Sequence, residues 1–442
     1  MLKSIRLKNF KLHEDTSIEA APITVFIGPN NSGKSSIFQA LLALRQAASR
    51  GSDVLVEPAN RQPTSPEQPY LFPGDGIIDL GEFKDVLRRG ETEIQLEVTG
   101  SSCPPKHLDF EEPINVAFEV HCRDNRLGYH KGRLQLPQGA IHWEWIGSYP
   151  TQGAESSVRI QGLQLRFTAV NNFRLLSPFE SLLDKAGRDV LPAARVAHVR
   201  EMESRLSGVP RALLDSLHAI LPIRGFEEWG YPLPQERAHH LERLTLPDRA
   251  VSLVTTIASD SRLKKEVSDR LSDLLNIRVD IEYVGANRVK IFAIGEKGGD
   301  GQRLFVNEGT GANQLPFILV PVAVAAKNET ILLSEPEAHL HPKGQCELTR
   351  MLLTVAKKEN IQFFIETHSE HVLHVILNAI GKREWEPNQV AIYSFENVNG
   401  TAQVTRLEVD EQGGVKGGIP GFFDQSLDEL TEYLETLKKP TV

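Results

Sequence analysis

The stretch Gly28-Pro-Asn-Asn-Ser-Gly-Lys-Ser35 decides how this chain can fold. It fits the pattern G-x-x-x-x-G-K-[ST], in which glycines let backbone N–H groups curl around phosphate oxygens. The apolar run 23–27 before it predicts a buried strand, and the spacing of apolar residues from 37 to 44 predicts a helix after it. A strand, a glycine loop and a helix in this order are typical of a phosphate-binding loop, so we expect a bound nucleotide.

Each part of this loop has an expected task. Lys34 would reach the terminal phosphates, and the Ser35 hydroxyl would hold Mg²⁺. The start of the following helix adds roughly half a positive charge. The predicted nucleotide-binding residues of the loop are Asn30, Asn31, Ser32, Gly33, Lys34, Ser35 and Ser36.

A second buried strand is predicted at 331–333, and Ser334-Glu-Pro-Glu337 follows it directly. Open α/β sheets bind ligands outside the carboxyl ends of their strands. A P-loop enzyme needs a carboxylate beside Mg²⁺ and a group that orients the attacking water. We predict that Glu335 is the general base. The alternative is a solvated acidic loop without catalytic work.

Composition and charge exclude several classes of protein. The 442 residues are 40% hydrophobic and 24% charged, which is ordinary for a globular chain of about three domains. Three cysteines are too few for a disulfide framework. The net charge of −9 gives no global attraction to nucleic acid or membranes. The longest apolar run, 315–326, is well short of the roughly 20 residues that span a bilayer. No signal peptide is recognisable, and we expect a cytoplasmic protein.

Hydrophobic periodicity predicts an α/β fold. Strand and helix patterns alternate in the last third of the chain, which predicts a mixed or parallel sheet with flanking helices. We expect an ATPase-type head made of 1–90 and 278–442, because Gly28 and Glu335 must meet at one nucleotide. An antiparallel β subdomain is predicted over 91–175 and a helical insertion over 176–277, where Leu213, Leu214, Leu217 and Leu221 suggest one helix.

Further motifs extend this interpretation along the chain. They are Leu2-Lys-Ser-Ile-Arg-Leu-Lys-Asn-Phe10, Asp79-Leu-Gly-Glu-Phe-Lys-Asp85, Glu335-Pro-Glu-Ala-His-Leu-His-Pro342, Glu366-Thr-His-Ser-Glu-His371 and Gly421-Phe-Phe-Asp424. Together with the P-loop, they resemble the ABC-type P-loop ATPases of the SMC, RecF and OLD (overcoming lysogenization defect) group. The resemblance is greatest to compact prokaryotic "predicted AAA-family ATPases" that lack a Toprim domain.

The resemblance implies ATP and Mg²⁺ as cofactors and two ATP molecules held between two heads. Glu308-Gly-Thr-Gly-Ala-Asn-Gln314 resembles the signature loop, so Gly309, Thr310 and Gly311 would cap the γ-phosphate held by the other protomer. Asn313 stands where many members have Ser. His368 resembles the switch histidine that contacts the γ-phosphate. His339 and His341 fall in the D-loop, although His-x-His could also suggest a metal pair.

One residue departs from the family pattern. Ser334 stands where the family carries the acidic residue of the Walker B motif. A hydroxyl can hold an Mg²⁺-bound water but adds no charge to the site. We therefore predict a metal site of Ser35 and Ser334, the latter through water, and slow hydrolysis.

The resemblance favours an ATP-dependent homodimer or higher homo-oligomer that acts as a switch. It would be the sensor or scaffold of a bacterial defence system against phage or plasmids, acting on a separate effector such as a nuclease, because nothing after His368 resembles a Toprim domain. One alternative is an ATP-bound scaffold that hardly hydrolyses. Another is a DNA repair or maintenance ATPase that binds DNA directly, for which local basic clusters exist at Arg88 and Arg89, at Arg123, Arg126, Lys131 and Arg133, and at Arg262, Lys264 and Lys265.

Overall fold

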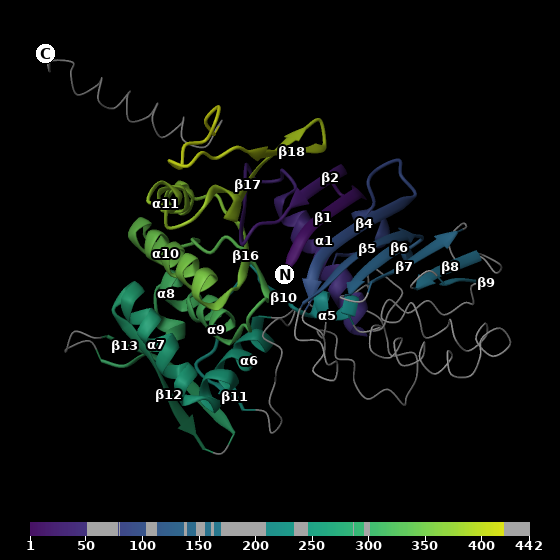
Figure 1. Ribbon diagram of the computed structural model, residues 1–442. Helices are drawn as coiled ribbons and strands as arrows, with labels where there is room; N and C mark the ends of the chain where they lie inside the picture. The colour runs from purple at the N-terminus through teal and green to yellow at the C-terminus, as the bar shows by residue number, and fades with distance from the viewer. Residues whose placement is uncertain are drawn as a thin grey trace, which may run out of the picture.

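A six-stranded sheet forms the centre of the molecule. Figure 1 shows the labelled helices and strands. The computed structural model describes residues 1–50, 78, 80–102, 113–136, 139–146, 155–160, 163–168, 209–233, 246–285, 287–295 and 301–419. In spatial order the strands of this sheet are β10 (Leu217–Ile220), β15 (Thr330–Ser334), β16 (Gln362–Glu366), β3 (Ile23–Ile27), β17 (Val390–Val398) and β18 (Thr401–Leu407). The first five are parallel and β18 is antiparallel.

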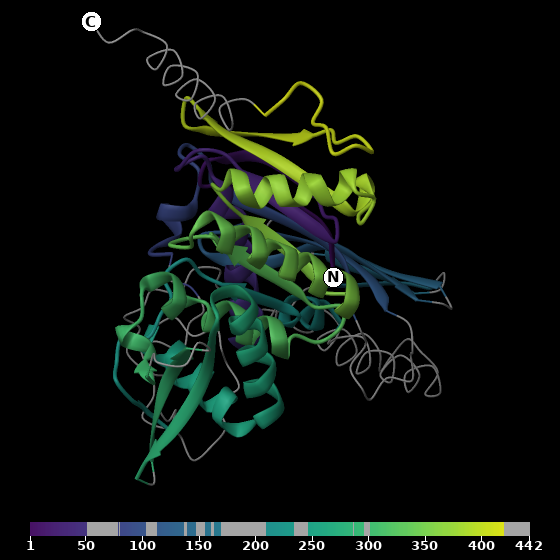
Figure 2. The same ribbon diagram turned by 90° about the vertical axis from the view of Figure 1, so that its left-hand side faces the viewer.

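Both faces of this sheet are covered, which is why its central strands are apolar without interruption. Leu332 and Phe364 face α1 (Lys34–Arg50) on one side. Leu333 and Ile365, one residue further along, belong to the core on the other side. The helices of that second core are α6 (Leu246–Ser259), α7 (Ser261–Leu275), α9 (Pro316–Val324), α10 (Pro342–Glu359) and α11 (Glu370–Gly381). Figure 2 shows α10 and α11 side by side.

An antiparallel sheet packs on the outer side of α1. Its strands are, in spatial order, β2 (His13–Glu19), β1 (Leu2–Phe10), β4 (Glu93–Ser102), β5 (Ile114–Arg123), β6 (Arg126–Leu136), β7 (Gly139–Ile146), β8 (Glu155–Ile160) and β9 (Leu163–Thr168). The short helix α5 (Val209–Asp215) packs with α1 beneath it. Residues from both sheets share one core with α1, so the helix that carries the P-loop is buried on nearly every side.

A third, small sheet lies at the far end of the head. It consists of β11 (Tyr231–Pro232), β13 (Arg288–Gly295), β12 (Ile277–Val284) and β14 (Arg303–Leu304), and α7 packs on β12. The hairpin of β12 and β13 projects from the body in both views (Figures 1 and 2). The remaining short elements are α2 (Phe83–Val86), η1 (Phe305–Asn307), α8 (Thr310–Gln314) and η2 (Pro387–Gln389).

The predicted α/β fold class is confirmed, but one local prediction is wrong. Leu213 and Leu214 lie in α5, whereas Leu217 begins strand β10, and Leu221 follows that strand. Short apolar runs do not distinguish helix from strand by periodicity, and here parallel pairing with β15 decides the outcome.

The sheets also cross the domain boundaries that the sequence suggests. Strands β4–β9 continue the N-terminal hairpin of β1 and β2, and β10, within the predicted helical insertion, completes the central sheet. The sheets thus do not follow these boundaries, and the division into domains stays a prediction. The motif 421–424 lies outside the described residues. Among the described helices, none is both long and apolar enough to cross a membrane.

A buried amide joins the antiparallel sheet to the central one. The Gln362 side chain is 3% exposed. Its Oε1 accepts hydrogen bonds from the Leu2 backbone N–H and the Thr330 hydroxyl, both at 2.8 Å. Its Nε2 donates to the backbone oxygens of Leu2 and Ala21 at 2.9 and 3.0 Å. Every hydrogen-bonding position of this side chain is therefore used.

Replacing this amide should destabilise the whole head. We expect Gln362→Met, which nearly keeps the volume, to lower the free energy of unfolding by about 2–4 kcal/mol, because it leaves buried polar groups unpaired. Urea denaturation followed by fluorescence and circular dichroism measures this. Gln403→Met on exposed β18 is the matched control, for which a change within about 0.5 kcal/mol is expected. Equal midpoints for the two variants would contradict this role of Gln362.

Candidate active site

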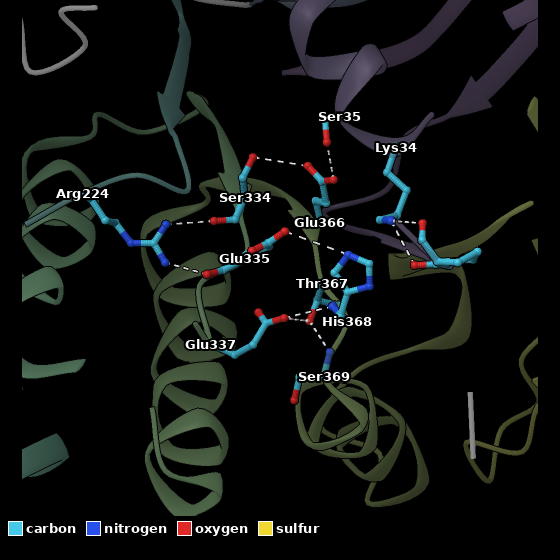
Figure 3. A network of polar contacts seen from close by, with 12 residues as sticks. Lys34, Ser35, Arg224, Ser334, Glu335, Glu337, Glu366, Thr367, His368 and Ser369 are labelled. Atoms are coloured by element: carbon cyan, nitrogen blue, oxygen red, sulfur yellow. Dashed lines mark hydrogen bonds and ion pairs between the residues drawn. The ribbon is translucent and has the colours of Figure 1, made fainter. Parts of the chain in front are cut away.

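The carboxyl ends of three neighbouring parallel strands meet at one edge of the central sheet. In β15 and β16, Ser334 is the register partner of Glu366, and Glu366 is in turn the partner of Phe26 in β3. The P-loop leaves β3 directly after this point and enters α1. Residues far apart in sequence are thereby brought to one place, shown in Figure 3.

The P-loop has the backbone shape of a phosphate cradle. Gly28 has a φ of 136°, and a Cβ there would lie 2.2 Å from the Phe395 backbone oxygen, so only glycine fits. Asn30 and Asn31 are exposed at the tip of the loop. The Ser32 hydroxyl is buried without a hydrogen-bond partner among the described residues. An unpaired buried hydroxyl and a loop that requires glycine at position 28, both just before α1, fit a bound phosphate.

Two basic side chains brace this loop from within. The Lys34 ammonium donates to the backbone oxygens of Gly28 and Pro29 at 2.9 and 2.8 Å. His13, from β2, is fully buried and lies 3.0 Å through Nε2 from the Gly33 oxygen, and 2.9 Å through Nδ1 from the Thr16 hydroxyl. Burial lowers the pKa of His13. A neutral ring that donates from Nε2 and accepts at Nδ1 satisfies both contacts.

Glu366 is the carboxylate nearest the P-loop serine. Its Oε1 accepts from the Ser35 hydroxyl at 2.5 Å, and its Oε2 accepts from the Ser334 hydroxyl at 3.3 Å. The side chain is 4% exposed, and burial raises its pKa. The sequence alone does not assign Glu366 a role, because it ends a different strand from the one that precedes the expected acid. Its position before Thr367-His368 at the end of an apolar strand was the available signal.

The predicted base and switch histidine lie side by side. Glu335 has a φ of 45°, a left-handed conformation that costs about 1–3 kcal/mol in a residue with a side chain. This turn ends β15 and directs Glu335 toward His368, with 3.9 Å between Glu335 Oε1 and His368 Nε2. Burial and then nearby Lys34 lower the pKa of His368. The ring is therefore neutral at pH 7 and can donate one hydrogen bond to a ligand.

A second acid of the same turn holds the histidine segment in place. Glu337 is buried, and its Oε1 accepts from the Thr367 hydroxyl at 2.6 Å and from the His368 backbone N–H at 2.9 Å. Its pKa is raised, chiefly by burial. Glu337 therefore positions the switch segment through these two hydrogen bonds.

Arg224 is a further residue that the sequence did not reveal. Its guanidinium donates to the backbone oxygens of Ser334 at 2.9 Å and Glu335 at 2.5 Å (Figure 3). It also donates to the backbone oxygen of Leu221 at 3.0 Å. Burial lowers its pKa to about 10, so it is still charged at neutral pH. A buried cation thus fixes the strained peptide that carries the predicted base. No motif marks it, since it lies in a loop far away in sequence.

The predicted signature loop contacts the turn that follows β15, at Ala338 and His339. Gly309 and Thr310 are exposed, while the Gln314 side chain donates to the Ala338 backbone oxygen. Gly311 lies so close to the His339 oxygen that a Cβ would approach it to 2.6 Å. No hydrogen bond or ion pair in the described residues joins 308–314 to the P-loop of the same chain.

Asn313 connects this loop to the segment of Arg224. Its side-chain amide accepts from the Phe226 backbone N–H at 2.6 Å and donates to the Phe226 oxygen at 3.0 Å. His339 is exposed in a left-handed turn, with a φ of 61°. His341 accepts at Nδ1 from the Lys343 backbone N–H at 3.3 Å and caps α10.

Comparison with known families agrees with this geometry. A family described as "AAA ATPase domain" matches residues 1–97 and 252–373, which include the P-loop, the predicted base and the switch histidine. The OLD nuclease of Thermus scotoductus is 22% identical over 387 residues. This chain is a P-loop ATPase. Residues 386–432 of the ATPase match a family described as a protein of unknown function, DUF3696.

The ATPase spans only part of its curated relatives. The match to the OLD nuclease covers 84% of this chain and 59% of that protein. The DNA double-strand break repair Rad50 ATPase of Methanococcus maripaludis is 45% identical over 289 residues, which is 64% of this chain and 26% of Rad50.

Solved structures similar to the ATPase include two SMC heads. An SMC head bound to the C-terminal winged-helix domain of ScpA has a TM-score of 0.48 at 12% identity, with 93% of this chain and 98% of that chain covered. The SMC head of Thermotoga maritima has a TM-score of 0.40 at 14% identity, with 92% and 99% covered.

Removing the guanidinium that holds the base should slow hydrolysis without abolishing ATP binding. We expect Arg224→Met to lower kcat by at least about tenfold, which corresponds to 1.4 kcal/mol, and to change ATP affinity little. Arg224→Lys keeps the charge, but an ammonium lacks the forked donors that bind three backbone oxygens, so its kcat should also be low. Phosphate release and nucleotide titration measure the two quantities. Arg89→Met on the surface is the control, and equal kcat values for Arg224→Met and Arg89→Met would contradict the assignment.

Proposed function

We propose that this protein is a slowly hydrolysing ATPase whose heads associate when ATP is bound and separate after hydrolysis. The observation that carries the proposal is the meeting of Lys34, Glu335 and His368 at the carboxyl edge of the sheet (Figure 3). The P-loop would hold the phosphates of ATP. Ser35 would hold the Mg²⁺ of the nucleotide, whose charge would offset that of the phosphates.

The proposed chemistry assigns one task to each side chain. Lys34 would turn from its loop carbonyls to the terminal phosphates. Glu335 would accept a proton from the attacking water, and it is half-exposed at a turn where water can reach it. His368 would donate a hydrogen bond from its neutral ring to the γ-phosphate or to that water.

The exposed part of the signature loop supports a composite site between two copies. Gly309 and Thr310 face solvent and make no described hydrogen bond to their own P-loop. Their backbone N–H groups would be offered to the γ-phosphate of a second copy. The ATP-bound form of the dimer would then be favoured by contacts that the separated heads cannot make.

The same contacts would let the dimer interface respond to hydrolysis. Asn313 binds the backbone of Phe226, and Arg224 in the same loop binds the peptide of Glu335. A shift of the signature loop against a partner would therefore move the loop that fixes the predicted base. This chain of hydrogen bonds is our proposed link between nucleotide and quaternary state.

The setting we propose is bacterial defence against phage or plasmids, with this ATPase as the sensor or scaffold of a separate effector such as a nuclease. Support comes from the similarity to a protein named OLD nuclease. The match to Rad50, a protein named for repair of DNA double-strand breaks, favours DNA repair as a second candidate.

The acidic partners of the predicted basic clusters weaken the case for direct DNA binding. Several of their cations are paired with acids of the same chain: Arg88 with Glu14, Arg123 with Glu93, Lys131 with Glu119, Lys264 with Asp280 and Lys265 with Asp269. Cations paired in this way contribute less to a field that could attract phosphates. Salt-sensitive binding of duplex DNA by the purified protein would nevertheless favour the repair candidate.

ATP should produce a dimer that depends on both the P-loop and the signature loop. We expect Glu335→Gln, which traps bound ATP, to double in mass by light scattering with Mg²⁺ and ATP but not with ADP. Adding Lys34→Ala should abolish ATP binding and the dimer together. Adding Thr310→Arg should abolish only the dimer, because Thr310 is exposed and forms no described hydrogen bond with its own P-loop.

Thr354→Arg, on the exposed surface of α10, is the matched control and should leave the dimer intact. A dimer that ignores nucleotide, or one that tolerates Thr310→Arg, would contradict the switch. If Glu335→Gln forms the dimer normally and the unmodified protein hydrolyses no ATP, the non-hydrolysing scaffold is favoured.

A further inference from the structure

We propose that Glu366 supplies the carboxylate that position 334 lacks, so that the Mg²⁺ of the bound nucleotide is held by Ser35 and Glu366, while Ser334 positions Glu366. This inference rests on the proposed ATP-binding function. It changes the metal site predicted from the sequence, in which Ser334 itself held the metal through water.

The register of the sheet provides the first argument. Side chains of a strand alternate between the two faces of a sheet, so Leu332 and Ser334 share a face, as do Phe364 and Glu366. Leu332 and Phe364 pack into the core that contains α1. Ser334 and Glu366, paired directly across the two strands, therefore lie on that same face, at the end where α1 begins.

The contacts of Glu366 provide the second argument. One carboxylate oxygen is 2.5 Å from the Ser35 hydroxyl, which is the P-loop group expected on the metal. The other oxygen accepts from Ser334 at 3.3 Å. The Ser334 hydroxyl thus points at the carboxylate, which is the arrangement of a group that orients a ligand.

The charge of the site provides the third argument. Glu366 is 4% exposed, and a buried carboxylate needs a cation or strong hydrogen bonds to stay ionised. In the described part of the chain, Glu366 forms no ion pair, and the ammonium of nearby Lys34 is used by the backbone of the P-loop. Carboxylate, hydroxyl and phosphate oxygens are the ligands that Mg²⁺ prefers. The donor set therefore fits Mg²⁺, which would also supply the missing positive charge.

The test compares ATP affinity with and without the metal. A fluorescent ATP analogue is titrated into Glu366→Gln and unmodified protein, once with Mg²⁺ and once with EDTA. The unmodified protein should gain affinity from Mg²⁺, and Glu366→Gln should lose at least about tenfold of that gain. In EDTA the variant should bind as well as the unmodified protein or better, because a negative charge near the phosphates has been removed. Glu359→Gln, exposed at the end of α10, is the control and should behave as the unmodified protein.

Exchanging the two residues makes the test independent of folding defects. Glu366→Ser should lose the Mg²⁺-dependent gain, and adding Ser334→Asp should restore it by returning a carboxylate to the facing strand. An Mg²⁺-dependent gain that is unchanged in Glu366→Gln would overturn the inference, as would Glu366→Ser without a rescue by Ser334→Asp. If Lys34→Ala binds ATP as well as the unmodified protein, the proposed function fails. If Lys34→Ala loses ATP binding but Glu366→Gln keeps the full Mg²⁺-dependent gain, only this inference fails.

Discussion

Parallel pairing of β3, β15 and β16 is the constraint on which the rest of this structure depends. The pairing brings Phe26, Ser334 and Glu366 into one register, and with them the start of the P-loop, the strained turn of Glu335 and the segment of His368. Each of these three segments leaves a strand whose five residues are all buried. A shift of one residue in either pairing would turn Glu366 or Ser334 away from α1. The candidate nucleotide site therefore depends on the apolar packing of these three strands.

Buried charges and amides complete what the strands begin. Arg224 fixes the turn of the predicted base, Glu337 fixes the segment of His368, and Gln362 ties the antiparallel sheet to the central one. All three are buried groups whose loss leaves other buried polar atoms unpaired, which is costly in a site of low dielectric. Apart from the hydroxyls of Thr330 and Thr367, their contacts are with backbone oxygens and N–H groups, so these residues set the path of the chain. The expected catalytic groups, Glu335 and His368, can then remain accessible to water.

The sequence alone was sufficient for those parts of the fold that local patterns determine. The P-loop, strands β3 and β15 and helix α1 follow from glycine spacing and from runs and spacings of apolar residues, which depend only on neighbours in the chain. Strand β10 was mistaken for helix, because Leu217 becomes a strand residue only through its pairing with β15. Arg224 and Glu366 were missed for the same reason. Their roles arise from contacts between residues more than a hundred or three hundred positions apart, as in Arg224 with Ser334 and Glu366 with Ser35.

The most direct test of this account is a crystal structure of Glu335→Gln with Mg²⁺ and ATP. We expect phosphates in the loop 28–35, the metal on Ser35 with Glu366 in its coordination sphere, and Gly309 to Gly311 of a second copy against the γ-phosphate. ATP bound away from the carboxyl edge of β3, β15 and β16 would contradict it.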